Sequence, residues 1–398
     1  IDDTKEVAEK LIYDIQSKLA ELKQDSIVFN IAKKFSSAND FLCFNKSDFE
    51  KSLSEGLKKA KEYNLGKVKK YQLANSNIKY IESFKKGIVE RFNTPVIKTG
   101  FGKLDEVLDG GLYEGLYILE GASSVGKTSL VLQMADNIAA GDNTTDVIIF
   151  ALEISQNELI AKSLSRLTAK LSLEKNVEIS NGKTTRGITL KESYKADKQL
   201  IKEACKRYEK YASNIYMHIC DDINAYDIRE KIEKHIKNTS KAGRKVVAII
   251  DYIQIMSDCD EKYRSSNQNI RQNIVELKRI TRDLRMPIIG VSSAISDDSI
   301  IYSSDVLLNL QLAGPKENKE DIIKAMKQNP RNMEISIFKN RNGSVGKYIE
   351  YMYYPQYNLF EENENNEHFT KEVSKNIAED RLNQVQNNKS VLKKKTKR

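Results

Sequence analysis

The sequence predicts an α/β protein whose mostly parallel, twisted sheet is covered by helices on both faces. From about residue 96 to residue 360, apolar strands alternate with helical segments, which is the pattern of parallel strands joined by crossover helices. Within that region, residues 121–128 read Gly-Ala-Ser-Ser-Val-Gly-Lys-Thr and lie between an apolar strand at 116–120 and a helix-like stretch at 129–140. The other predicted strands are 146–152, 214–220, 246–250, 287–292, 305–312 and 333–339, followed by a hairpin of 348–354 and 357–360.

The 121–128 segment matches the phosphate-binding loop pattern G-x4-G-K-[ST] in the strand–loop–helix context that this pattern requires. Glycines let the backbone curl so that successive N–H groups point at a triphosphate, and the helix N-terminus adds partial positive charge. Lys127 is expected to reach the β- and γ-phosphates, and the Thr128 hydroxyl to bind Mg²⁺. The predicted nucleotide-binding residues of this loop are Gly121, Ala122, Ser123, Ser124, Val125, Gly126, Lys127, Thr128 and Ser129.

Two acidic residues end predicted strands, at the edge of the sheet where ligands bind in such folds. Asp251 follows the strand 246–250 and is expected to hold Mg²⁺ through water. Glu153 follows the strand that ends at residue 152 and allows two interpretations. Its carboxylate either polarises an attacking water as a general base or caps the helix that follows.

Two cations, Lys339 and Arg341, follow the strand 333–338 in a turn that contains Gly343. They suit the neutralisation of phosphate charge, either in the same subunit or across an interface. A solvated basic turn is the competing interpretation.

Composition limits the class of protein. The 398 residues carry 65 Lys and Arg against 56 Asp and Glu, and the net charge of +9 fits a nucleic-acid partner without requiring one. The four cysteines (Cys43, Cys205, Cys220 and Cys259) show no C-x-x-C spacing, which argues against a disulfide framework or a zinc site and fits the cytoplasm. No apolar run reaches membrane-spanning length, so no membrane partner is expected. The first residue is Ile rather than Met, so we expect a longer polypeptide.

The regions outside the α/β domain are expected to be simpler. Residues 1–75 are predicted to form a small helical N-terminal region without a visible site. Residues 76–95 are predicted to form a linker helix that either folds back on its own domain or docks on a neighbouring subunit. The domain itself is assigned to 96–360, and 361–398 to a polar, basic and disordered tail.

Several motifs occur in an order that resembles the motor domain of DnaB-type replicative helicases. The motifs are Thr99-Gly-Phe with Leu104-Asp105, the 121–128 loop, Ala151-Leu-Glu-Ile154, Ile250-Asp-Tyr-Ile-Gln-Ile-Met256 and Lys339-Asn-Arg-Asn-Gly343. The resemblance covers roughly 76–360 and implies a RecA-like ATPase that uses ATP and Mg²⁺. It further implies a hexameric ring of identical subunits that translocates on single-stranded DNA, and it allows a primase as partner or as part of a primase–helicase fusion.

The resemblance also implies roles for individual residues. Glu153 would activate water, Asp251 would serve the metal, and Gln254 would belong to the nucleotide site. Lys339 and Arg341 would reach into the site of the neighbouring subunit. The helix before the motor domain would pack on the adjacent subunit.

Two features depart from that pattern. After the strand that ends at Ser292, Ser293 stands where the family commonly has a longer polar sensor such as Gln. The DNA-gripping loop that should follow is reduced to 294–304 and holds no Lys or Arg, although surfaces that track a nucleic-acid backbone need positive charge. A second candidate loop, 257–269, carries both positive and negative charges and is interpreted first as a flexible solvated loop and second as a DNA contact.

Three functional hypotheses follow. The first is an ATP-dependent DNA helicase that acts in replication. The second is a RecA-like ATPase without unwinding activity, such as a helicase loader or a recombination accessory factor, which the shortened loop favours. The third is a catalytically silent scaffold, which the complete set of Lys127, Thr128, Asp251 and Glu153 disfavours.

Overall fold

A computed structural model describes residues 81, 84 and 85 and residues 96–363, apart from 190–196, 221, 240–242, 257–265, 294–297 and 315–318. The predicted helical region 1–75, nearly all of the linker helix and most of the predicted tail lie outside the described residues. The chain divides into two compact units at Thr94, and the unit that begins at Pro95 contains every element discussed below.

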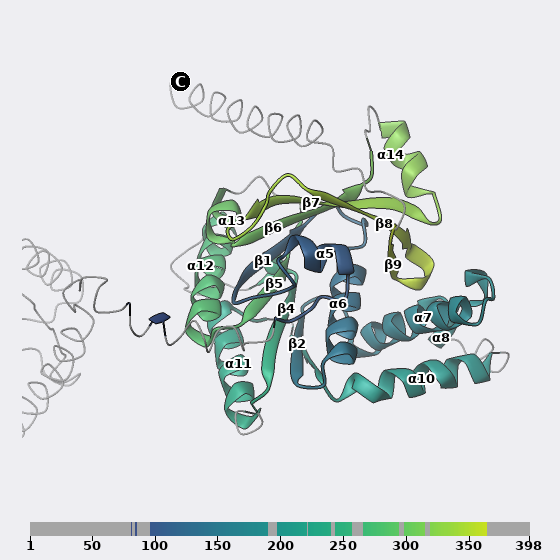
Figure 1. Ribbon diagram of the computed structural model, residues 1–398, viewed down its shortest axis with the longest axis horizontal. Coiled ribbons are helices and arrows are strands. Elements are labelled where there is room, and N and C mark those ends of the chain that lie inside the picture. Colours follow the sequence, from purple (N-terminus) through teal and green to yellow (C-terminus); the bar gives the residue numbers. More distant parts are fainter. Residues whose placement is uncertain are drawn as a thin grey trace, which may run out of the picture. The chain divides into compact units, whose positions relative to one another are not determined.

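One nine-stranded sheet forms the centre of this unit, with the strand order β3-β2-β4-β5-β1-β6-β7-β8-β9 (Figure 1). The first six strands in that order are parallel, and β7, β8 and β9 continue the sheet in antiparallel fashion. The strands are β1 (Gly115–Glu120), β2 (Thr145–Ala151), β3 (Ile215–Ile219), β4 (Lys245–Asp251), β5 (Pro287–Val291), β6 (Val306–Leu312), β7 (Arg331–Asn340), β8 (Tyr348–Tyr354) and β9 (Leu359–Glu362). The predicted mostly parallel α/β fold is confirmed.

Helices cover both faces of the sheet, because the parallel strands are apolar on both sides. One face packs against α5 (Gly102–Val107), α6 (Lys127–Gly141), α7 (Gln156–Glu174) and α10 (Lys198–Ala212), with the short α8 (Thr185–Thr189) beside α7. The other face packs against α11 (Ala225–Thr239) and α12 (Ser266–Leu284) (Figure 1). Two further helices, α13 (Asp298–Ser303) and α14 (Lys319–Met326), flank β6. Short 3-10 turns span Ile179–Asn181, Ile253–Ile255 and Pro355–Tyr357.

The β1 and β2 strands are buried at every residue, and this explains why their sequences are continuous apolar runs rather than alternating ones. By contrast, β7 and β8 alternate between buried and partly exposed residues, as expected for antiparallel strands with one packed face. None of the helices in the described part of the chain combines the length and apolar composition needed to cross a bilayer.

A buried ion pair joins the helix after the phosphate loop to its neighbour. Arg166 on α7 contacts the Asp136 carboxylate on α6, and its Nη1 donates to the Asn358 carbonyl before β9 at 3.0 Å. Both charged side chains are almost fully buried. Because a buried charge must keep its partner, this pair fixes α6 against α7 and β9.

Several element boundaries differ from the predicted ones, and two of these differences have a structural reason. Helix α12 begins at Ser266, so the last residues of the segment predicted as a loop are helical; Ser and Asn suit the start of a helix. At the other end, β9 continues to Glu362, beyond the predicted boundary at 360. The reason is a tertiary contact, because the Glu362 carboxylate accepts from the N–H groups of Gly102 and Lys103 at 2.9 and 2.8 Å.

Candidate nucleotide-binding site

The phosphate loop connects β1 to α6 in the predicted position, and its glycines are required by close packing. Gly126 has φ of +103°, and a Cβ there would lie 2.8 Å from the Tyr353 ring and 3.0 Å from the Phe360 ring. A Cβ on Gly121 would lie 2.5 Å from the Leu310 carbonyl oxygen. The loop therefore rests on β6, β8 and β9, and only glycine fits at these two positions.

Lys127 lies over the loop that it follows. Its ammonium donates to the carbonyl oxygens of Gly121 and Ala122, both at 2.8 Å. Burial lowers the pKa of Lys127, and the nearby Asp251 carboxylate opposes that shift. Phosphate oxygens compete well for this ammonium, because charge-assisted hydrogen bonds are stronger than those to neutral carbonyls.

Asp251 ends β4 and is 8% exposed. Burial raises the pKa of its carboxyl group, while a hydrogen bond from the Thr128 hydroxyl opposes the shift. Its Oδ1 is buried and has no hydrogen-bond partner among the described residues. An unpaired carboxylate oxygen beside a hydroxyl is a suitable donor set for Mg²⁺, which prefers oxygen ligands. No group of three or more His, Cys, Asp or Glu side chains that could hold a metal occurs in the described part of the chain, so phosphates and water would complete the coordination.

Glu153 lies two residues beyond the end of β2, with an exposed side chain. The Tyr252 hydroxyl donates to Glu153 Oε1 at 2.8 Å, and the Glu153 charge contributes to raising the pKa of Asp251. The helix-capping interpretation does not hold, because Ser155 caps α7 by accepting from the Glu158 N–H. The Glu153 carboxylate therefore does not cap α7, and it lies close to Asp251, the candidate metal ligand.

Two other predicted residues make contacts inside the domain. Gln254 Nε2 donates to the Ser292 hydroxyl at the end of β5 at 2.5 Å. The Ser129 hydroxyl donates to Asn358 and accepts from Tyr353 in the core. The backbone N–H of Ser129, rather than its side chain, is therefore the group that could bind a phosphate.

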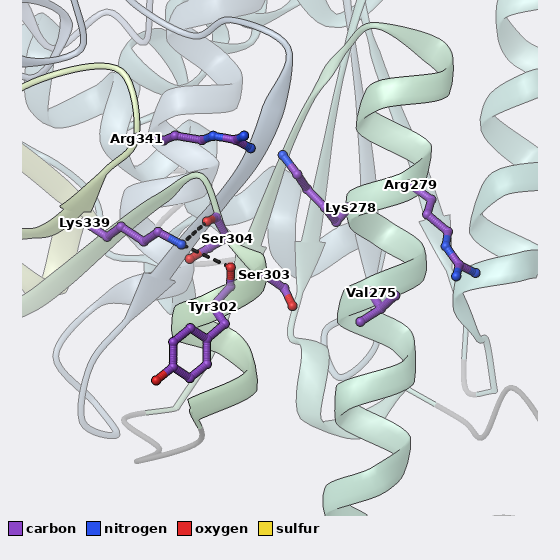
Figure 2. Close-up of a pocket in the computed structure, with 8 residues that line it drawn as sticks. All are labelled: Val275, Lys278, Arg279, Tyr302, Ser303, Ser304, Lys339 and Arg341. Atoms are coloured by element: carbon purple, nitrogen blue, oxygen red, sulfur yellow. Dashed lines mark hydrogen bonds between the residues drawn. The ribbon is translucent and has the colours of Figure 1, made fainter. Parts of the chain in front are cut away.

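Lys339 and Arg341 lie at a different place, in a cleft of about 490 Å³ between α12, α13 and the end of β7 (Figure 2). We call this cavity the basic cleft. Its lining consists of Val275, Lys278, Arg279, Tyr302, Ser303, Ser304, Lys339 and Arg341. None of these residues belongs to the phosphate loop, so the structure does not bring the predicted basic pair to the nucleotide site of its own chain. Burial lowers the pKa of Lys339, and Asp305 opposes this shift.

Comparison with known proteins identifies the family. The protein-family model described as the DnaB-like helicase C terminal domain matches residues 96–362 of this chain. The chain belongs to this family. The replicative DNA helicase DnaB of Geobacillus stearothermophilus is 27% identical over 276 residues, which cover 66% of this chain and 56% of the relative. The chain thus spans little more than half the length of that helicase.

Solved structures of other proteins share the fold. One solved ATPase domain superposes with a TM-score of 0.56 at 19% identity, and the match covers 73% of this chain and 100% of that one. A DnaB-like replicative helicase whose interactions with primase were studied superposes with a TM-score of 0.56 at 17% identity, over 88% of this chain and 78% of that one. The predicted resemblance and the RecA-like fold are confirmed.

Three residues with clear contacts at these sites were not predicted. Tyr252 directly follows Asp251, so its position beside the strand-end acids is a usable signal. Lys278 lies among other cations on the polar side of α12, and Asp305 directly precedes β6. Nothing in the local sequence distinguishes Lys278 or Asp305, because what sets them apart is the ion pair that they form in the folded protein.

Proposed function

We propose that this chain is the motor part of a replicative DNA helicase that hydrolyses ATP and translocates on single-stranded DNA. The observation that carries the proposal is the buried Asp251 oxygen that no described residue binds, beside Thr128 and with Lys127 and Glu153 close by, in a member of the DnaB-like helicase family. A buried carboxylate with one oxygen lacking a partner is stabilised when a cation binds that oxygen. ATP with Mg²⁺ supplies that cation.

Different residues of the chain would then bind the phosphates, hold the metal and accept the proton. The backbone N–H groups of 121–128 and the Lys127 ammonium bind the phosphates, and Thr128 and Asp251 hold the metal. Bound Mg²⁺ neutralises phosphate charge. Glu153 accepts the proton of the attacking water, and the Tyr252 hydroxyl orients its carboxylate through Oε1.

We extend the proposal to assembly and partners. A homo-oligomeric ring, hexameric as in the family resemblance, places Arg341 at the nucleotide site of the neighbour, where its exposed guanidinium stabilises transition-state charge. The structural neighbour studied with primase makes a primase a reasonable partner. The cytoplasm is the proposed location.

One observation favours a second candidate function, an ATPase without unwinding activity. The segment 294–304 contains no Lys or Arg, and its described part includes the short helix α13. A surface that tracks a DNA backbone needs cations. Such a protein would act as a loader or accessory factor.

Measuring ATP hydrolysis with and without single-stranded DNA separates the two functions. The helicase proposal predicts turnover that rises with single-stranded DNA, together with displacement of the paired strand from a forked duplex. Turnover that does not respond to DNA, without strand displacement, would favour the accessory ATPase. An absence of hydrolysis under all conditions would overturn both.

A further inference from the structure

A cation that the sequence analysis did not assign lies beside the phosphate loop. Arg331 is the first residue of β7, and its Nη1 donates to the carbonyl oxygen of Ser124 in the loop at 3.2 Å. Ser124 has φ of +65°, a left-handed conformation that costs free energy in a residue other than glycine. The hydrogen bond therefore connects the guanidinium to a strained position of the loop.

A second connection between Arg331 and the loop runs through Tyr353. The two residues lie opposite one another in the antiparallel pair of β7 and β8. The Tyr353 ring in turn packs against Gly126, where a Cβ would lie 2.8 Å from it. Burial raises the pKa of the Tyr353 hydroxyl, and a hydrogen bond with Ser129 and the charge of Arg331 oppose that shift. Arg331 is therefore held close to the loop by the sheet as well as by its own hydrogen bond.

The charge of Arg331 has no counter-ion in the described part of the chain. The side chain is half-buried and forms no ion pair with a described residue, and its Nε is buried without a hydrogen-bond partner there. Arg244, which is also half-buried, differs because it contacts the Asp146 carboxylate. Taking a charge out of water is unfavourable unless an opposite charge comes close. The surroundings of Arg331 thus favour the binding of an anion.

We propose that Arg331 is a nucleotide-binding residue of its own chain, and that the triphosphate bound by residues 121–128 is its counter-ion. This inference rests on the proposed function and deepens it. The guanidinium keeps its charge at all physiological pH values and has several N–H donors, of which the Ser124 carbonyl occupies one. It adds a second positive charge to that of the Lys127 ammonium. ATP gains more from this charge than ADP does, because ATP is the more negative of the two. Arg331 thereby favours ATP over its hydrolysis product.

The test measures the Kd of Arg331→Met for ATP, ADP and inorganic triphosphate, each of which displaces a fluorescent nucleotide. We expect the Kd for ATP to rise about tenfold, as when an interaction with a charged group is lost. The Kd for ADP should rise only about threefold, because less charge interacts with the guanidinium. Inorganic triphosphate should lose as much affinity as ATP, since the contact involves the phosphates. The kcat should stay within about twofold of wild type, because the charge acts on the ground state and the transition state alike.

Two variants serve as controls. Arg331→Lys keeps the positive charge, so its Kd for ATP should stay within about threefold of wild type. Lys327→Gln removes one positive charge from the exposed segment between α14 and β7 without a contact to the loop. Its Kd for ATP should stay within about twofold, as for most surface substitutions.

Three outcomes would overturn the inference. If Arg331 only tethered the loop, Arg331→Met would weaken ATP and ADP by the same factor. An unchanged affinity for ATP in a folded Arg331→Met protein would exclude any role in binding. A loss for ATP that inorganic triphosphate does not share would place the guanidinium on the base or the ribose.

Thermal unfolding without nucleotide checks that Arg331→Met is folded. If it is not, Arg331→Gln, which keeps a donor for the Ser124 carbonyl, replaces it with the same expected results. A wild-type protein that does not bind ATP would instead contradict the proposed function, whereas normal ATP binding with equal losses for ATP and ADP would contradict this inference alone.

Discussion

The nucleotide site and the basic cleft both concentrate charge, but they hold it in different ways. At the nucleotide site, Asp251 is buried with an oxygen that no described residue binds, and Lys127 donates to neutral carbonyls of its own loop. In the basic cleft, Lys278 and Arg341 share a carboxylate, and Lys339 has three acceptors. The first site is therefore incomplete without a ligand, whereas the cations of the second are held by other groups of the chain although the cleft keeps an excess of positive charge. Substitutions at the first should abolish chemistry, and those at the second should weaken communication between subunits.

The largest effect is expected for Lys127→Ala. ATP turnover should fall by ~10³-fold or more, because the phosphates lose the only ammonium placed over the described loop. A steady-state ATPase assay measures this. Ser123→Ala in the exposed part of the loop should remain within about twofold of wild type, because the loop is expected to bind through its backbone. A Lys127→Ala protein with substantial turnover would show that the nucleotide is bound elsewhere.

Glu153→Gln should come next, with a loss in kcat of about 10²–10³-fold and nearly unchanged nucleotide binding, because the base is lost while the phosphate contacts remain. Single-turnover hydrolysis and fluorescent-nucleotide titration measure the two quantities. Tyr252→Phe removes only the hydrogen bond to Glu153 and should cost about fivefold. Equal losses in both variants would contradict the assignment of Glu153 as the base.

A smaller effect is expected for Lys339→Met, which removes the contacts to the end of α13. Turnover should fall about fivefold, the equivalent of roughly 1 kcal/mol, and Glu153→Gln subunits should not restore it, because its partners lie in the same chain. Steady-state ATPase assays of Lys339→Met alone and mixed with Glu153→Gln subunits measure this. Rescue of Lys339→Met by Glu153→Gln subunits would show instead that Lys339 acts across an interface.

The smallest effect concerns stability. Burial raises the pKa of Asp251 above its ordinary value of 3.8, so its contribution to stability is fully present below pH 3.8 and is lost as the pH rises through the folded-state pKa. At neutral pH the ionised carboxylate therefore destabilises the metal-free protein. Asp251→Asn should raise the free energy of unfolding by about 0.5–2 kcal/mol while abolishing turnover.

Thermal melts in EDTA across pH test the Asp251→Asn prediction, and the gain should shrink as the pH is lowered. A destabilised Asp251→Asn protein at neutral pH would contradict the view that the nucleotide site is incomplete without its cation.

Much of the nucleotide site could be predicted, because its residues are adjacent in sequence or end neighbouring parallel strands. The loop 121–128 and Asp251 fall into this class. The strand-end position of Glu153 leaves its role open between base and cap. Ser155 and Glu158, however, have the spacing of a capping box, in which the Ser side chain binds the N–H three residues on. This local pattern alone is enough to indicate Ser155 as the cap.

The sequence by itself determined the fold class, the phosphate loop and the strand-end acids, because periodicity and local motifs depend on residues close together in the chain. Only the tertiary structure placed Lys278 beside Arg341 and turned Lys339 toward α13. Those partnerships join α12, α13, β6 and β7, which are separated by many residues. The pairing of Lys278 with Arg341 exists because Asp305, directly before β6, forms ion pairs with both cations. No sequence pattern indicates which of several charged side chains will lie beside a given carboxylate in the folded protein.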